Sequence, residues 1–389
     1  MNLSVRKEQR IKSIDVLRGF AILGIFLVNI PTMLGIESSL EERSYHGFDA
    51  YLRLFYDLFV QTKFYVIFSF LFGLGFWIFM SRAEQKGANI YRLFVRRLVI
   101  LLVFAFVHIV LFWNGDILNT YAVTGFWLLL FYKRNPKTIF IWSIVLLILS
   151  EMLTILGSFV ETTEFVSASV PAFNQFNGWS EHAYGRVQFF LKYNIASNII
   201  LSPEILGLFL LGLFAGKIEL FQRVSVLRKQ TRIVQIIALL LTIPSWLMLI
   251  VNFSSTNYNP MESYVYVVTS GKTLSVFYVT SLLLLLEKER WQLFLSPVGC
   301  VGQLALTNYI AQTIVTTTLF ALLFDNTADI SLWQSAIYCL AFYTLQIFLS
   351  KWYLSQYRFG PLEWLWRRGT YGGGKSLKAT ELKKPKIHG

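Results

Sequence analysis

The feature of this sequence that most constrains its fold is a series of long apolar blocks separated by short polar segments. A helix needs about 20 apolar residues to cross the hydrocarbon core of a bilayer, because each residue advances it by about 1.5 Å. Several blocks reach about that length with few charges. The composition agrees, because 15% of the residues are charged and 55% hydrophobic, whereas soluble domains carry roughly 25% charged residues. We therefore expect an all-α polytopic membrane helix bundle.

The apolar blocks define about ten spans. They lie at roughly 14–34, 64–80, 98–113, 117–132, 138–158, 200–216, 233–251, 269–286, 298–323 and 331–350. Glycine and proline interrupt some blocks, which leaves nine and eleven spans open as alternatives. Residues 1–369 are expected to form one bundle domain, followed by a flexible basic tail at 370–389. The polar segment 187–199 is expected to re-enter the membrane or to lie at its surface.

The distribution of Lys and Arg predicts the orientation of the bundle. Alternate inter-span segments carry 28 of these residues on one side and only three (Arg43, Arg53 and Arg186) on the other. Lys and Arg accumulate in short cytoplasmic loops. This asymmetry predicts that both termini are cytoplasmic. Although the net charge is +13, the cations lie in short loops and form no stripe with interleaved aromatics, so we expect no nucleic-acid partner.

Cysteine and histidine patterns indicate no metal site. Cys300 and Cys339 both lie in apolar stretches, where cysteine is a small packing residue. His46 and His182 fall in polar outer segments and are expected at the surface. The run Ser270–Thr273 resembles the end of a phosphate-binding loop, but it lacks the required upstream glycine and strand, so we set it aside.

Ionisable and amide side chains within the spans are candidates for function, because such groups are expensive in a membrane. In the first span, Asp15 and Arg18 are three residues apart and can pair on one helical face. An interfacial ion pair at the helix start is an equally weighted interpretation. Asn29 follows deeper in the same helix and needs hydrogen-bonding partners. Lys63 at the second span either snorkels to the outer surface or contributes to a site.

The third span holds the candidate catalytic pair, His108 and Asp116. A carboxylate that orients an imidazole is the usual arrangement for a general base. The pair lies about 12 Å apart along a straight helix, so direct contact requires the turn at Gly115 to fold back. Arg96 and Arg97 begin this span. They either serve only as cytoplasmic charges or bind the phosphates of a donor.

Further polar residues lie in later spans. Asn308 and Gln312 share one face of the ninth span, where they either line a cavity or hold neighbouring helices. Glu204 follows Pro203 at the head of the sixth span, and we treat it, like Asp15, as a structural polar residue.

These residues lie within motifs that resemble the YeiB-like bacterial membrane protein family. The motifs are Ile14-Asp-Val-Leu-Arg-Gly19 with Asn29, Lys63-Phe64 to Gly73, Arg96-Arg97 to His108 with Phe112-Trp-Asn-Gly-Asp116, Leu304 to Thr313, and Phe359-Gly-Pro-Leu-Glu-Trp-Leu-Trp-Arg367. The carboxy-terminal part of that family, here about 220–369, is known as the domain of unknown function 418. The resemblance implies a multi-pass protein of the bacterial plasma membrane.

The family is similar to a wider group of membrane acyltransferases that includes the lysosomal heparan glucosaminide acetyltransferase. This wider resemblance implies acyl transfer from a cytoplasmic acyl-CoA, as co-substrate, to an acceptor on the far side. The donor would contact Arg18, Asn29, Lys63, Arg96, Arg97, Asn308 and Gln312. In the glycan-modifying branch the position of Asn29 is typically a histidine. We expect His108 to replace it, with no permanently bound cofactor.

Two other functions stay open. A transporter or exporter would use an intramembrane path for protons or substrate, formed by His108, Asp116, Glu204 and Lys192. Transporters of this kind carry broken helices at matching places in two halves, and no internal repeat or pair of broken segments is evident here. A structural or lipid-sensing protein would leave the pairing of His108 with Asp116 unexplained. Membrane lipids are expected partners in every case, and homo-oligomerisation is left open.

Overall fold

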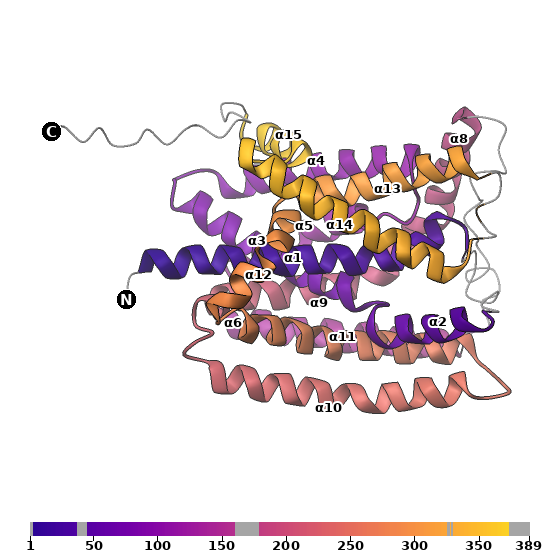
Figure 1. Cartoon of the computed structure of the whole chain (residues 1–389). Coiled ribbons are helices and arrows are strands. Elements are labelled where there is room, and N and C mark those ends of the chain that lie inside the picture. The colour runs from indigo at the N-terminus through magenta and orange to yellow at the C-terminus, as the bar shows by residue number, and fades with distance from the viewer. Residues whose placement is uncertain (1–2, 37–44, 160–178, 325–326, 328–329, 373–389) are drawn as a thin grey trace.

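The computed structural model describes residues 3–36, 45–159, 179–324, 327 and 330–372. Within these ranges the regular elements are helices, with no strand among them. Nine segments of the described part are long and apolar enough to cross a membrane. This confirms the expected all-α fold of a multi-pass membrane protein. Figure 1 shows most of the long helices running between two ends of the molecule.

The helices follow one another along the chain with short connections. They are α1 (Leu3–Met33), α2 (Phe48–Phe59), α3 (Lys63–Glu84), α4 (Ile90–Leu111), α5 (Leu118–Trp127), η1 (Leu128–Leu130), α6 (Pro136–Ser158), α8 (Trp179–Phe189), η3 (Phe190–Asn194), α9 (Ile195–Lys217), η4 (Leu220–Gln222), α10 (Arg228–Phe253), α11 (Pro260–Leu285), α12 (Glu289–Gln303), α13 (Ala305–Leu323), α14 (Leu332–Gln356) and α15 (Pro361–Tyr371).

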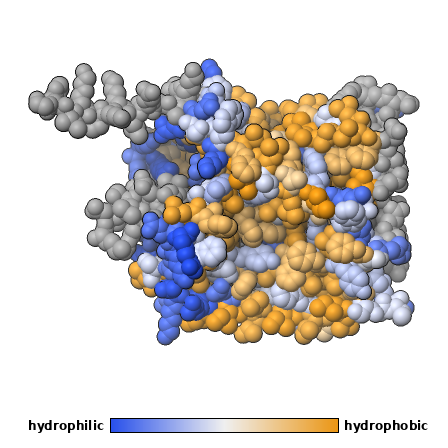
Figure 2. All heavy atoms as spheres, in the orientation of Figure 1, coloured by the Kyte–Doolittle hydropathy of each residue, from blue (hydrophilic) through white to orange (hydrophobic). Residues whose placement is uncertain are grey.

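The two ends of the bundle differ in polarity. Figure 2 shows an apolar band over the middle of the molecule and a hydrophilic zone at the end where α1 begins and α15 lies. We call this the basic end and the opposite one the far end. At the far end Asp49 accepts hydrogen bonds from the backbone N–H groups of Leu332 (3.0 Å) and Trp333 (3.1 Å), which caps α14.

Helices α5 and η1 together form a shorter apolar segment after α4. This segment, Leu118–Leu130, is apolar but shorter than the nine long candidates. After it, the Tyr132 hydroxyl donates to the Glu84 carboxylate at 2.6 Å, and Lys217 donates to the carbonyl of Arg134 at 2.7 Å. Glu84 and Lys217 end α3 and α9, so α5 and η1 return the chain to the end where those helices finish. In the described part of the chain, the nine long segments and this short one are compatible with the expected count of about ten spans.

Glycines allow the central helices to touch backbone to backbone. A Cβ on Gly302 of α12 would lie 1.9 Å from the carbonyl oxygen of Asp15 in α1. A Cβ on Gly73 of α3 would lie 1.9 Å from the carbonyl oxygen of Phe209 in α9. Neither position accepts a side chain, because real Cβ atoms do not approach backbone oxygen so closely. These contacts are the small-residue seams by which membrane helices pack.

Two apolar segments are broken, in contrast to the unbroken spans expected from the sequence. Helices α2 and α3 join at Val60–Thr62, where Thr62 has a positive φ of 68°. Helices α12 and α13 join at Leu304, so the expected single span 298–323 is two helices. Neither break carries a glycine at the joint, and so composition did not reveal them.

The break before α3 moves Lys63 away from the membrane surface. Because α2 precedes α3 within the same 37-residue apolar segment, Lys63 begins α3 inside the bundle and is fully buried. Its ammonium donates to the carbonyl of Asp57 at 2.6 Å and to the Ser270 hydroxyl at 3.3 Å. The snorkelling interpretation of Lys63 is therefore wrong.

The segment 187–199 does not form a re-entrant loop. Helix α8, a π-helical turn at Phe190–Asn194 and α9 form one continuous helical stretch to Lys217. The tail expected from residue 370 lies mostly outside the described residues, and α15 extends to Tyr371.

Candidate functional site

The structure brings His108 and Asp116 together inside the bundle. His108 Nδ1 lies 3.1 Å from Asp116 Oδ1, and both side chains are buried. The same carboxylate oxygen accepts a hydrogen bond from the Tyr309 hydroxyl at 3.0 Å. The rings of His108 and Tyr309 are 5.6 Å apart. Among the described residues neither ring nitrogen of His108 has a hydrogen-bond partner, so the approach of Nδ1 to Asp116 is a close polar contact. Three groups capable of proton exchange thus meet at one place in the apolar interior.

A local turn creates this contact. Helix α4 ends at Leu111, and residues 112–117 fold the chain back into α5. A Cβ on Gly115 would meet the Trp113 ring at 2.2 Å, so the turn requires glycine. The second Asp116 oxygen accepts the backbone N–H of Asn119 at 3.3 Å, which satisfies a free donor at the start of α5. The turn therefore both orients Asp116 and begins the next helix.

An apolar cavity of about 480 Å³ lies beside this group. Its walls are mostly aliphatic and aromatic: Ile22, Ile25, Phe68, Leu71, Phe72, Phe76, Phe94, Leu101, Ile117 and Leu118. The hydroxyl-bearing residues Tyr121 and Tyr309 also line it. Tyr309 is thus the member of the His108 group that faces the cavity, because it contacts both the cavity and Asp116.

A second cavity of about 680 Å³ opens toward the basic end. Seven cationic residues line it: Arg18, Arg82, Lys86, Arg97, Arg358, Arg367 and Arg368. One carboxylate, Asp15, is present and lies 3.4 Å from Arg18. The excess of positive charge indicates an anionic ligand. We call this cavity the basic mouth and the apolar one the inner cavity.

The basic mouth and the inner cavity are continuous. They share Asp15, Arg18, Gly75, Arg97, Arg358, Phe359 and Arg367 in their linings. A ligand that places anionic groups among the arginines can therefore extend an apolar portion toward Tyr309.

Arg97 is held in place at the junction of the two cavities. Its guanidinium stacks 3.5 Å over the Trp366 ring, and the Trp366 indole N–H donates to the Arg97 carbonyl at 2.8 Å. Arginine suits such a position because its planar fork stacks on aromatic faces while it donates to phosphate. Arg96, in contrast, is exposed and lines neither cavity. The donor-binding role proposed for Arg96 is not supported by its position.

Helix α15 connects the basic mouth to Tyr309. Glu363 of α15 accepts the backbone N–H groups of Leu306 (2.8 Å) and Thr307 (3.0 Å), the first turn of α13. A carboxylate is favourable at a helix N-terminus, where backbone donors are free. Burial raises the pKa of Glu363 above its ordinary value. The hydrogen bonds from Thr307 and Leu306 lower the pKa and offset this effect only in part. Glu363 thereby fixes the start of the helix that carries Tyr309.

The remaining predicted site residues lie elsewhere. Asn308 donates to Ser350 at 3.0 Å, and Gln312 donates to Gln346 at 2.8 Å, so both hold α13 against α14. Neither lines the basic mouth or the inner cavity, nor does Asn29, which is half-buried in α1. Of the two interpretations of Asn308 and Gln312, the helix-holding one fits their contacts.

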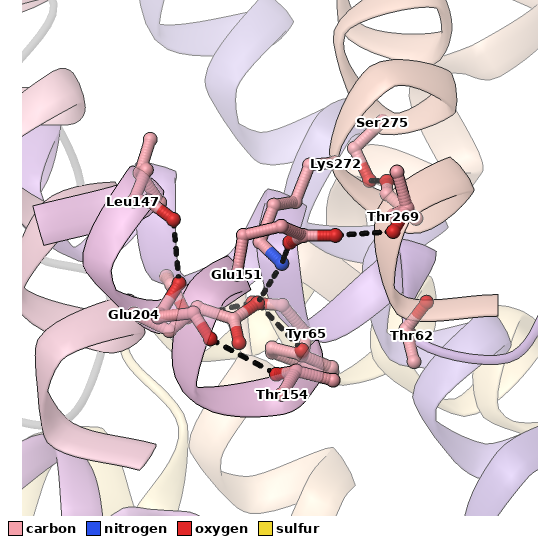
Figure 3. A network of polar contacts seen from close by, with 12 residues as sticks. Thr62, Tyr65, Leu147, Glu151, Thr154, Glu204, Thr269, Lys272 and Ser275 are labelled. Carbon is pink, nitrogen blue, oxygen red and sulfur yellow. Dashed lines mark hydrogen bonds and ion pairs between the residues drawn. The ribbon is translucent and has the colours of Figure 1, made fainter. Parts of the chain in front are cut away.

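A separate network of charged residues lies between α3, α6, α9 and α11 (Figure 3). Lys272 Nζ lies 2.6 Å from Glu151 Oε2 and 3.6 Å from Glu204 Oε1. Glu204 also accepts the Tyr65 hydroxyl at 2.8 Å, and Glu151 accepts that of Thr269. Glu204 is therefore a buried member of this network.

We expect loss of Lys272 to destabilise the bundle strongly. Lys272→Met leaves the two carboxylates of Glu151 and Glu204 without their shared cation in an apolar interior. Breaking a fully buried ion pair typically costs about 3–5 kcal/mol, and a loss below that range is expected here because the side chains of Lys272 and Glu151 are 16% and 23% exposed. Thermal unfolding in detergent measures the effect, with Lys229→Met as control, because Lys229 is exposed and the charge change is the same. Equal midpoints for the two variants would contradict a structural role for the network.

Several of these residues were missed from the sequence. Tyr309, Glu363 and Arg367 lie within the motifs of the YeiB-like family. Their residue types are common, and no feature of the neighbouring sequence indicated that they contribute to a site. Lys272 lies in the run Ser270–Thr273, whose resemblance to a phosphate-binding loop gave no indication of its ion pairs. Glu151 interrupts an otherwise apolar span, and the general rule on charged membrane residues would have found it.

Comparison with known proteins identifies relatives along nearly the whole chain. The uncharacterized 39.9 kDa protein in the amylase 3′ region of Bacillus acidopullulyticus is 34% identical over 378 residues, covering 94% of each chain. The uncharacterized protein YxaH of Bacillus subtilis (strain 168) is 32% identical over 398 residues, 94% of this chain and 95% of its own. The chain belongs to their family.

This family is the YeiB-like one. The uncharacterized protein YeiB of Escherichia coli (strain K12) is 25% identical over 396 residues, 93% of this chain and 96% of its own. The family model described as a protein of unknown function, DUF418, matches residues 215–373. No solved structure matches the chain. In this YeiB-like protein the matched region begins near the end of α9 and extends through α15. It therefore includes Tyr309 and Glu363, whereas His108 and Asp116 precede it.

Proposed function

We propose that this protein transfers an acyl group from an acyl-CoA at its basic end to an acceptor at its far end. The observation that carries the proposal is the continuity of the basic mouth with the inner cavity, which leads to Tyr309 and the pair of His108 and Asp116. We further propose that the basic end is cytoplasmic and that the membrane is the bacterial plasma membrane.

The two cavities match the two chemical halves of the donor. An acyl-CoA carries phosphates at one end and a thioester with an apolar chain at the other. Arginine clusters bind phosphate through charge-assisted, often bidentate hydrogen bonds. Apolar walls favour the acyl chain by about 0.8 kcal/mol for each buried CH₂. Free nucleotides lack the apolar portion, and simple fatty acids lack the phosphates.

The reaction needs one base and releases one thiolate. The acceptor oxygen or nitrogen attacks the thioester carbonyl, a C–O or C–N bond forms, and the C–S bond breaks. The acceptor proton moves to His108, and the CoA thiolate leaves toward the basic mouth and takes up a proton from solvent. Because His108 lines neither cavity, the proton reaches it from the inner cavity by way of the Tyr309 hydroxyl and Asp116, whose Oδ1 lies 3.1 Å from His108 Nδ1. Tyr309 stands between this pair and the donor.

Membrane vesicles of both orientations test the donor and its side of entry. We expect acyl-CoA binding and thioester cleavage in inverted vesicles, where the proposed cytoplasmic end faces the added donor, and little in right-side-out vesicles. Free CoA release is the measurement, and detergent-solubilised protein gives the total activity. Cleavage in right-side-out vesicles alone would overturn the orientation. Absence of binding in solubilised protein would overturn the donor assignment.

One observation favours a transporter as second candidate. The breaks between α2 and α3 and between α12 and α13 lie in the two halves of the chain, as in transporters with discontinuous helices. Uptake or efflux of a small anion by proteoliposomes, with no thioester cleavage, would support this alternative.

A further inference from the structure

A third cavity lies at the basic end, apart from the proposed donor path. It has a volume of about 500 Å³ and is lined by Phe20, Arg228, Arg232, Gln235, Tyr278, Ser281, Leu282, Leu284, Leu285 and Lys288. It shares no lining residue with the basic mouth or the inner cavity. The proposed acyl transfer therefore leaves it without a role.

The cavity is polar at its rim and apolar at its base. Arg228 and Arg232 are one turn apart on α10, and Lys288 follows the end of α11. All three side chains are exposed, and no carboxylate from the described part of the chain lines the cavity. Arg228 pairs with Glu287 at 3.3 Å, whereas no ion pair of Arg232 or Lys288 is found among the described residues. Two cations therefore remain available to an anion at the rim.

The base of the cavity is suited to a hydrocarbon chain. Phe20, Leu282 and Leu285 supply apolar surface from α1 and α11. Helix α10 packs mainly against α11 and lies at the periphery of the bundle in Figure 1, so the cavity is at the lipid boundary. The cavity lies among the first turns of α10 and the last turns of α11, which are the ends of two candidate spans, where phospholipid headgroups are expected.

We propose that this cavity binds one anionic phospholipid, with its phosphate at Arg232 and Lys288 and an acyl chain along Phe20 and Leu282. Basic pockets between membrane helices on the cytoplasmic side bind acidic headgroups. The free N–H groups at the start of α10, which has no side-chain cap, add a favourable field for the phosphate. The lipid fills the space between α10, α11 and α1. The proposal is independent of the acyl-transfer function.

Lipid retention by purified protein tests the site. The protein is reconstituted with phosphatidylcholine containing a fraction of phosphatidylglycerol, extracted, and examined by native mass spectrometry. Wild type is expected to retain one phosphatidylglycerol. Arg232→Gln with Lys288→Gln should retain it about 30-fold more weakly, since each of the two cations near a membrane surface contributes about 1 kcal/mol.

A matched double variant separates the cavity from general charge. Lys229→Gln with Arg290→Gln removes the same charge at the same end, and neither residue lines the cavity. This control is expected to retain phosphatidylglycerol like the wild type. Equal loss in both double variants would overturn the site, as would equal retention of phosphatidylcholine. Displacement of the lipid by millimolar inorganic phosphate would assign the cavity to a small anion and overturn the lipid proposal.

Discussion

Replacement of His108 by alanine is expected to reduce acyl transfer by roughly two to four orders of magnitude, the usual contribution of a positioned general base. The imidazole is buried, and its Nδ1 contacts Asp116. Donor affinity should change little, because His108 lines neither the basic mouth nor the inner cavity. The measurement is free CoA release at saturating donor, together with donor binding by calorimetry on the same preparation.

Three further variants make the His108 test specific. Asp116→Asn should leave a larger residual activity, because the base remains while its orientation weakens. Tyr309→Phe removes the hydrogen bond to Asp116 and keeps the ring that lines the inner cavity. His46→Ala is the control, because His46 is exposed. Full activity in His108→Ala would contradict the assignment of His108 as the base and would indicate that another group at the far end accepts the proton.

Replacement of Arg97 by glutamine is expected to weaken acyl-CoA binding roughly 10- to 150-fold, because hydrogen bonds to charged groups contribute about 1.5–3 kcal/mol. Arg97 stands where the basic mouth meets the inner cavity and is fixed by the Trp366 ring. Calorimetric titration of detergent-solubilised protein with acyl-CoA measures the loss.

The adjacent residue is the natural control for Arg97. Arg96→Gln makes the same charge change one residue away, at an exposed position outside both cavities, and should leave affinity unchanged. Arg97→Lys keeps the charge but loses the planar stacking on Trp366, so an intermediate affinity is expected. Equal losses for Arg96→Gln and Arg97→Gln would show a general charge effect and contradict the donor site.

The sequence alone determined the class of the fold. Long apolar blocks can be satisfied only by helices that pair their own backbone groups within the membrane, so the all-α bundle follows from composition and block length. The same argument identified His108, Asp116 and Glu204 as candidates, because burying an ionisable side chain in an apolar segment costs free energy unless the side chain has a partner. Such signals are local and can be read from a single segment.

Tertiary structure decided which of these residues meet. The two arginines of the Arg96-Arg97 pair are equivalent in sequence, yet consecutive residues lie about 100° apart around a helix, and only Arg97 faces the cavities. Asn308 and Gln312 share a face, but whether that face meets α14 or a cavity depends on the crossing of helices far apart in sequence. The spacing of the two residues in the sequence is the same whether they contact α14 or line a cavity.

The longest-range features were out of reach of the sequence. Glu363 caps α13 from 56 residues away, and Lys272 joins Glu151 from 121 residues away. The sequence of one helix shows which polar side chains it carries, but the packing of the helices determines which partner each of them contacts. The apolar blocks therefore determined that this chain is a multi-pass membrane protein, while packing alone placed the basic mouth, the inner cavity and Tyr309 next to one another.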